Sequence, residues 1–159
     1  MFDAFLKIDG IKGESTDSKH KDEIEIESFS WGVSQSGSFA TGGGGGAGKA
    51  QFQDFHFNTN VSKASPLLFL RCATGEHIKE ATLTVRKAGE QKQDFMHLKM
   101  NDILISSYQS SGSAGQELPT DQVSINFAKI EFSYQAQRAD GSLDAPVTAG
   151  WDLKLNKKV

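Results

Sequence analysis

The stretch GSFATGGGGGAGKAQF, at residues 37–52, contains the residue types and spacing that come closest to a chemical motif. Gly43, four further residues and then Gly48 and Lys49 reproduce the spacing of a phosphate-binding loop. Two features argue against that chemistry. In a phosphate-binding loop the lysine is followed by a serine or threonine whose hydroxyl binds magnesium, but here Ala50 follows Lys49. The loop should also lead into a helix whose N-terminus binds the phosphate, but here it leads into QFQDFHF, which has the alternation of a strand. A small glycine-loop hydrolase or nucleotide-binding enzyme therefore stays only as the alternative function.

The other reactive side chains form no spaced motif either. The four histidines, His20, His56, His77 and His97, lie far apart along the chain, with no second ligand at metal-site spacing. Cys72 is the only cysteine, which excludes an internal disulfide, and it falls on the apolar stripe of a predicted helix. A small core residue is expected there rather than a nucleophile. The sequence predicts a protein that is not an enzyme and that uses neither a cofactor nor a metal.

Length and composition are those of an ordinary globular domain. The 159 residues, 37% of them hydrophobic, are enough for a single domain over residues 1–159. A formal net charge of −3, with lysine and arginine scattered along the chain, gives no reason to expect a nucleic-acid partner. The first residues, MFDAFLKIDG, lack the apolar region of a signal peptide, and no stretch approaches the roughly 18 apolar residues of a membrane span. We expect folding in the cytoplasm and no membrane insertion.

The elements that must position these residues are mostly strands, because the dominant hydrophobic period is two residues. Alternation begins at Phe2–Ile8, ends there at an Asp-Gly turn, and recurs in residues 24–31, in residues 52–57 and onward to the C-terminus. The phase of the alternation shifts by one residue near Asp102 and near Ala128. Each shift predicts a bulge or a bend of the kind that curves a sheet toward closure.

One segment, residues 62–73, has helical rather than strand spacing and predicts the only helix. The residues behind this prediction are Ser62 or Ser65 as N-cap, Pro66 in the first turn, Leu67, Leu68 and Cys72 as the buried stripe, and Gly75 as the stop. Many short strands with one helix predict a β-dominated fold. It is expected to be a small β-barrel of two antiparallel sheets with one flanking α-helix.

Two glycine- and serine-rich stretches are predicted to be long loops: residues 34–50, expected to be extended, and Ser106 to Gly115. Loops of this size are either functional or simply flexible surface segments. In residues 24–31, Phe29 and Trp31 share a face with glutamates, so both faces of that strand carry apolar residues. Such a strand needs cover beyond its own core, and with adaptable loops this points to self-association.

Several stretches are similar to a known family. They are KIDGIKGES at 7–15, SFSWGVSQSGS at 28–38, GGGGGAGKA at 42–50, LTVRKAG at 83–89, and INFAKIEFSYQAQRADG followed by GWDL. In this order, from Phe2 to about Leu155, they resemble the Hcp family. These haemolysin-coregulated proteins are the tube subunits of the bacterial type VI secretion system.

The resemblance implies a β-barrel subunit that assembles into a homohexameric ring. Such rings stack into a tube that resembles a phage tail tube, with a spike protein at its tip and sheath proteins around it. The tube carries effector proteins in its lumen. By the same resemblance, the protein is cytoplasmic before firing and is then secreted through the type VI apparatus.

The resemblance also assigns candidate positions. The loop from Ser34 to Lys49 would project toward a neighbouring ring as a ring-stacking connector that becomes ordered on assembly. Its candidate residues are Ser34, Gly37, Ser38, Gly42, Gly43, Gly44, Gly45, Gly46, Gly48 and Lys49. Ser30 falls in the part of the family that faces cargo in the lumen, and Phe29 and Trp31 beside it are further lumen candidates.

Overall fold

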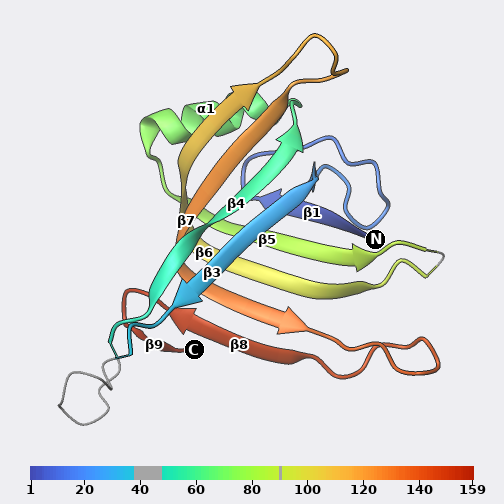
Figure 1. Cartoon of the computed structure of the whole chain (residues 1–159), viewed down its shortest axis with the longest axis vertical. Helices are drawn as coiled ribbons and strands as arrows, with labels where there is room; N and C mark the ends of the chain where they lie inside the picture. Colours follow the sequence, from blue (N-terminus) through green and yellow to red (C-terminus); the bar gives the residue numbers. More distant parts are fainter. Residues whose placement is uncertain (38–47, 90) are drawn as a thin grey trace.

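Nine strands and one helix make up the part of the chain that the structure describes (Figure 1). The structure is a computed structural model, and it describes residues 1–37, 48–89 and 91–159. The elements are β1 (Phe2–Ile8), β2 (Ile24–Ile26), β3 (Ser28–Ser34), β4 (Gln51–Asn60), α1 (Ser65–Thr74), β5 (Ile78–Lys87), β6 (Asp94–Ser111), β7 (Thr120–Tyr134), β8 (Val147–Asp152) and β9 (Lys157–Lys158). This confirms the predicted β-dominated fold with a single helix.

The two predicted sheets are two layers of one continuous antiparallel sheet. Its order is β2-β1-β5-β6-β7-β4-β3, and β8 with β9 continues from β7. The strands β6 and β7 belong to both layers: residues 96–101 pair with 129–134 in the first layer, and 103–111 pair with 120–127 in the second. The first layer adds β5, β1, β2, β8 and β9, and the second adds β4 and β3.

The change of layer occurs where the hydrophobic phase shifts, as predicted. Asp102 has a φ of 52°, and it is unpaired with Ala128, although the residues on either side of it are paired. The Ala128 carbonyl instead accepts a hydrogen bond of 2.8 Å from the Leu153 amide. Met100 and Ile103 are both buried, so burial passes from even to odd positions across the bend.

The curled sheet is nearly closed into a barrel. β2 and β3 lie at opposite ends of the sheet order, although only Glu27 separates them in sequence. The Glu27 amide donates to the Asn58 carbonyl at 2.8 Å, and the Thr59 hydroxyl donates to the Glu25 carbonyl at 2.7 Å. These contacts join β2 to β4. The predicted single strand over residues 24–31 is therefore two strands, because the chain must pass from one end of the sheet to the other at Glu27.

The core lies between the two layers and is built from aliphatic and aromatic side chains of the long strands. Its largest fully buried members are Phe55, Phe57, Leu6, Leu68, Leu83, Leu98, Met100, Ile103, Ile105 and Ile125. All but one of these come from strands, and the exception, Leu68, comes from α1. The core thus receives a single large side chain from the helix.

The ends of α1 are partly as predicted. Pro66 lies in the first turn, and Gly75 ends the helix in the left-handed conformation, with a φ of 67°. The N-cap is Ala64, so the prediction of Ser62 or Ser65 as N-cap is wrong. The Ser65 hydroxyl is used elsewhere, because it donates to the carboxylate of the buried Asp121 on β7.

The predicted buried stripe of α1 is only partly correct. Leu68 is fully buried and Cys72 is half-buried, but Leu67 is 41% exposed. The neighbouring Phe69 and Leu70 are more exposed still, at 60% and 50%. A helix that lies across the end of one strand buries only one side, so the other apolar side chains face outward.

The predicted loop from Ser106 to Gly115 is wrong over its first six residues, because β6 continues to Ser111. Its serines pair with β7, the Ser106 hydroxyl donates to Asp54 at 2.6 Å, and the Tyr108 hydroxyl donates to Asp121 at 2.7 Å. These partners are far away in sequence, so a polar strand resembles a loop when only local composition is considered.

We predict that Leu68→Ala lowers the free energy of unfolding by about 2 to 5 kcal/mol, because it removes a fully buried side chain and leaves a cavity. Leu70→Ala is the matched control on the same helix, and the half-exposed side chain should cost far less. Urea titration of the two variants measures the difference. Equal losses would contradict the assignment of Leu68 as the helix's core anchor.

Candidate functional site

The three lumen candidates lie on β3, the edge strand of the second layer, but not on one face of it. Ser30 is exposed on the outer face, whereas Phe29 and Trp31 are half-buried toward the core. The Phe29 ring stacks on Phe55 with centroids 6.0 Å apart, and Trp31 meets Phe132 edge-on at 5.4 Å. Of the three, Ser30 is the side chain most accessible to a bound molecule.

Ser30 belongs to a surface of hydroxyl, amide and imidazole groups on the outer side of the second layer. In register, Ser30 lies opposite His56, which is also exposed. Nearby, Asp54 accepts hydrogen bonds from Ser106 at 2.6 Å and from Asn126 at 2.9 Å. We call this surface the polar face: Ser30, Asp54, His56, Ser106, Ser107, Gln109, Gln122 and Asn126. A hollow of about 300 Å³ lies on it, bordered by side chains of β4, β6 and β7.

The root of the predicted ring-stacking loop is tightly built. Ser34 is the last residue of β3 and pairs with Gln51, so it belongs to the strand rather than to the loop. A Cβ atom on Gly48 would lie 2.5 Å from the Ser36 hydroxyl and 3.0 Å from the Ser36 carbonyl. Gly48 therefore allows a close approach of the two chain segments. Lys49 is exposed beside it. Gly37 is exposed three residues beyond the end of β3. The other candidates, Ser38, Gly42, Gly43, Gly44, Gly45 and Gly46, lie outside the described residues.

A second surface is apolar and lies where the two layers separate. A groove of about 200 Å³ is lined by Trp31, Val33, Phe52, Ile130, Phe132, Ala149, Gly150 and Trp151. We call it the apolar groove. Val33 and Phe132 are 54% and 38% exposed, and the lining contains no charged residue. The groove connects the edge strand β3 with β7 and β8.

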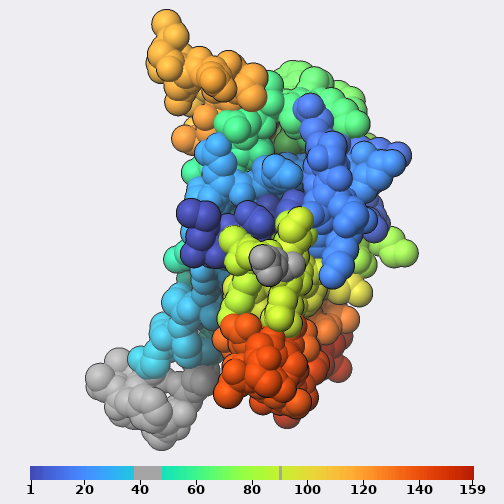
Figure 2. All heavy atoms as spheres, turned by 90° about the vertical axis from the view of Figure 1, so that its right-hand side faces the viewer, coloured from blue at the N-terminus to red at the C-terminus, as the bar shows by residue number. Residues whose placement is uncertain are grey.

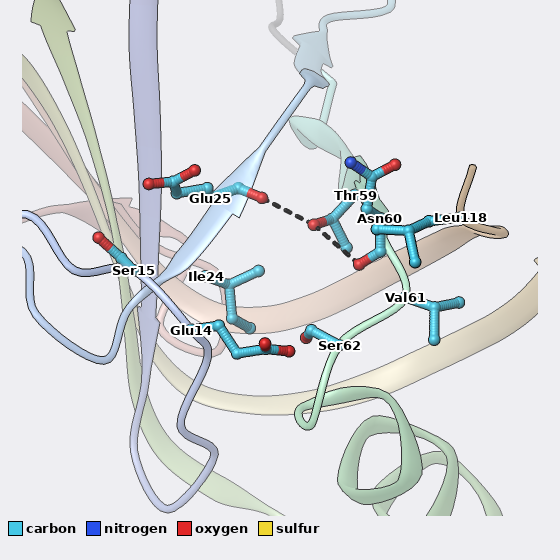
Figure 3. Close-up of a pocket in the computed structure, with 9 residues that line it drawn as sticks. All are labelled: Glu14, Ser15, Ile24, Glu25, Thr59, Asn60, Val61, Ser62 and Leu118. Carbon is cyan, nitrogen blue, oxygen red and sulfur yellow. Dashed lines mark hydrogen bonds between the residues drawn. The ribbon is translucent and has the colours of Figure 1, made fainter. Parts of the chain in front are cut away.

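Figure 3 shows a further pocket, of about 180 Å³, between β2 and the end of β4. The Thr59 hydroxyl on one wall is directed at the Glu25 carbonyl (Figure 3). On the other wall, the Glu14 carboxylate lies beside Ser62 and accepts a hydrogen bond of 2.8 Å from the Lys63 amide. The nine residues of the lining include no histidine, cysteine or lysine. The Glu14 carboxylate is paired with the Lys63 amide and makes no hydrogen bond to a hydroxyl group of the lining, so no base is coupled to a nucleophile in this pocket.

A buried ion pair holds the long connection between β1 and β2. Figure 2 shows this connection, in blue, above the turn that follows β5, in yellow-green. Arg86 is 4% exposed, with its Nη1 atom 2.9 Å from Asp17 and its Nη2 atom 3.5 Å from Asp3. Its guanidinium lies 4.8 Å from the centre of the Phe5 ring. Contact with this guanidinium lowers the pKa of the Asp17 carboxyl.

His20 completes the attachment of the same connection. Its ring stacks on Phe5 with centroids 4.5 Å apart, and it is itself buried. Nδ1 lies 3.1 Å from the Glu23 carboxylate and Nε2 lies 3.2 Å from Asp94 at the start of β6. Among the described residues, no three His, Cys, Asp or Glu side chains are grouped so that they could hold a metal ion.

Sequence reasoning missed the apolar groove and the exposed side of α1. The groove is formed by residues of β3, β4, β7 and β8, and only the strand pairing brings these together. The helix did carry a signal. Four consecutive apolar residues, 67–70, are more than one helix face can hold, so part of them must lie outside the core.

The chain matches one protein family over most of its length. The matching model is that of the type VI secretion system effector Hcp, and it covers residues 5–134. The chain belongs to the Hcp family. It is 44% identical to protein hcp1 of Pseudomonas aeruginosa over 156 residues, and this matched region covers 97% of this chain and 96% of that protein.

Solved structures agree with this assignment. A structure of a type six secretion system protein superimposes with a TM-score of 0.95 at 29% identity, over 100% of both chains. The crystal structure of Hcp1 from Salmonella typhimurium superimposes with a TM-score of 0.82 at 33% identity, over 99% of both chains. The resemblance found in the sequence is thereby confirmed.

Membership of the Hcp family supports several coarse statements about function. This Hcp-family chain is a tube protein of the type VI secretion system and a secreted protein, and the family is structural rather than enzymatic. It also supports self-association in general. No helix among the described residues is both long enough and apolar enough to span a membrane.

We predict that Asp17→Asn makes the stability of the subunit less sensitive to acid. The folded-state pKa of Asp17 is lowered relative to its unfolded value of about 3.9. Its ion pair with Arg86 therefore stabilises the fold above that pH, and the stabilisation is lost as the pH falls through the folded-state pKa. The urea midpoint of the wild type should consequently fall more steeply from about pH 5 to about pH 2 than that of Asp17→Asn.

Asp9→Asn is the control for this measurement, because Asp9 is exposed and has no ion pair among the described residues. Its acid profile should follow that of the wild type. Parallel profiles for Asp17→Asn and the wild type would mean that the pair with Arg86 does not contribute to acid sensitivity.

Proposed function

We propose that this chain assembles into hexameric rings that stack into the inner tube of the type VI secretion system and that carry effector proteins in the lumen. The observation that carries the proposal is a pair of open strand edges on the second layer. Family membership and the polar face support it further.

The first open edge is β3, whose residues 28–34 pair with β4 alone among the described residues. The second is the end of β6, where residues 104–111 pair with β7 but not with β5, because β5 pairing stops at Ile103. Unpaired backbone N–H and C=O groups on both edges can bind another strand. One copy of the chain therefore offers two separate strand-binding edges.

The two edges suit each other. Neighbouring strands in the order β6-β7-β4-β3 are all antiparallel, so with four strands the outer two also run in opposite directions. Copies placed side by side in the same orientation then bring β3 of one beside β6 of the next as an antiparallel pair. Repetition of this head-to-tail contact gives a ring when the rotation closes, and closure removes every exposed edge of the layer.

We assign the polar face to the lumen. The inner side of the second layer is covered by the core, so the polar face is the side that this layer offers to a bound molecule. Hydroxyl and amide groups there keep the wall hydrated and suit cargoes of different sequence better than an apolar wall would. Ser30 lies on this face, and the resemblance to the family also puts Ser30 in contact with cargo.

The remaining partners follow from the proposed tube. A spike protein would occupy the tube tip, sheath proteins would surround the outer wall, and the subunit would remain in the cytoplasm until firing. The alternative, a small glycine-loop enzyme, has less support. Gly48 is required by its close contact with Ser36, and the strand β4, not a helix, begins at Gln51.

Size-exclusion chromatography with light scattering, followed by negative-stain microscopy, tests the proposed ring. The expected result is a particle near six subunit masses that appears as a ring. A protein that stays monomeric at all concentrations up to those used for microscopy, and that changes its thermal midpoint on addition of ATP, would overturn the proposal in favour of the enzyme.

We predict that Ser30→Gln leaves the ring mass unchanged but weakens binding of at least some effectors by about tenfold or more, because a longer side chain enters the lumen wall. Ser113→Gln is the matched control, since Ser113 is exposed in the connection between β6 and β7 and not on the polar face. Pull-down with purified rings measures binding. Normal binding of every cognate effector by Ser30→Gln would contradict the lumen assignment.

We predict that replacing residues 36–49 by a short turn spares ring formation and abolishes tube elongation and secretion. The barrel should survive because Ser34 and Gln51 still close the β3–β4 pair. Stacking should fail because a head-to-tail filament needs both complementary surfaces. Alanines at Gly43–Gly46 provide a milder test, with partial loss of tube length expected.

Shortening the turn around the exposed Asp140, which connects β7 with β8 away from both ends of the second layer, is the matched control for this deletion, and tubes should still form. Light scattering reports ring mass and electron microscopy reports tube length. Long tubes from the 36–49 variant would exclude the stacking role, whereas loss of rings would show that the segment acts within a ring.

A further inference from the structure

We propose that the exposed apolar side of α1 in one copy fills the apolar groove of the next copy in the ring. This inference rests on the proposed ring, and it names the side-chain contact that would hold neighbouring subunits together. It involves two apolar surfaces that are exposed in the single subunit. One is the side of α1 formed by Leu67, Phe69 and Leu70, and the other is the apolar groove beside β3.

The helix side lies directly beside the open edge of β6. Phe69 is 60% exposed and packs against Tyr108 with ring centroids 6.4 Å apart. Tyr108 belongs to the part of β6 that has no pairing with β5. Leu67 and Leu70 flank Phe69 and are 41% and 50% exposed. Any strand that pairs with this edge of β6 brings its own subunit close to these three side chains.

The groove lies directly beside the other open edge. Trp31 and Val33, which form one wall, are residues of β3 itself. The opposite wall comes from Ile130, Phe132 and the β8 residues. A partner strand bound to β3 therefore lies next to the mouth of the groove.

Both surfaces also lie on the same side of the second layer. α1 packs on the core side, through Leu68, and the groove opens between the second layer and the first. Pairing of β3 with β6 of a neighbour thus brings the helix to the same side of the joined sheet as the groove. Figure 1 shows α1 near the top and the end of β3 with β8 in the lower part, so a subunit cannot fill its own groove. Through the strand pairing, Tyr108, which contacts Phe69, lies level with Phe29, four positions from Val33 along β3. The proposed contact therefore includes an offset of the neighbouring β6 along β3 by about four residues, the kind of stagger by which tilted strands close into a barrel.

Chemistry and size favour a second copy over a charged or polar ligand. The groove lining has no charged residue, and burial of a charged group there would leave it without a partner. A cavity of about 150 Å³ lined by apolar side chains is large enough to bind benzene. The groove, at about 200 Å³, therefore has room for an aromatic side chain such as Phe69.

Disulfide trapping tests this contact on the full-length chain. In a Cys72→Ser background, which removes the native thiol, Phe69→Cys is combined with Val33→Cys or with Ala149→Cys. Mild oxidation of either double variant should give a ladder of covalent oligomers up to the hexamer on a non-reducing gel. The matched controls are each cysteine variant alone and Phe69→Cys with Ser113→Cys, and all should remain mostly monomeric on that gel.

A second measurement uses Phe69→Asp, with Lys79→Asp as the control on exposed β5 surface. Phe69→Asp should keep the thermal midpoint of the monomer and weaken ring assembly by about tenfold or more, as expected for an aromatic anchor. Rings of normal mass without any ladder from either double variant would overturn the inference and leave the proposed ring intact. Absence of rings in the wild type would overturn the proposed function and, with it, this contact.

Discussion

Glu27 imposes the constraint on which the rest of the fold depends. This single residue connects β2 and β3, which are the first and last strands of the main sheet path. Only two residue steps, at most about 7 Å of extended chain, lead from the last residue of β2 to the first of β3, so the two ends of a seven-strand path must meet. The sheet can satisfy this only by curling almost completely, and the hydrogen bond between the Glu27 amide and Asn58 records where its ends join.

The curl is concentrated at the bends of β6 and β7, and these bends also separate the surfaces by chemistry. On one side of Asp102 and Ala128, β6 and β7 pair with each other, and each also has a second partner: β6 pairs with β5, and β7 pairs with β8. On the other side they form a four-stranded layer with a polar outer face, an apolar inner face and two open edges. A subunit built this way keeps its polar face, its core and its open strand edges apart.

Local pattern was sufficient for much of this architecture, because strand period, helix stop and phase shift are properties of neighbouring residues. The bend at Asp102 and the stop at Gly75 were both predictable in this way. Features that depend on distant partners were not. The serines of β6 resemble a loop until β7 is paired with them, Leu67 resembles a core residue until α1 is docked, and the apolar groove exists only after four strands are assembled.

The attachment around Arg86 has a consequence for the time course of folding. Asp3 and Arg86 are 83 residues apart in sequence, and His20 and Asp94 are 74 apart. Contacts between residues this far apart in sequence stabilise the chain only after a large loop has closed, so folds that depend on them form slowly. We therefore expect a newly synthesised chain to expose incompletely paired strands until these loops have closed. Until then, productive docking competes with aggregation, and the outcome depends on how many chains are maturing at once.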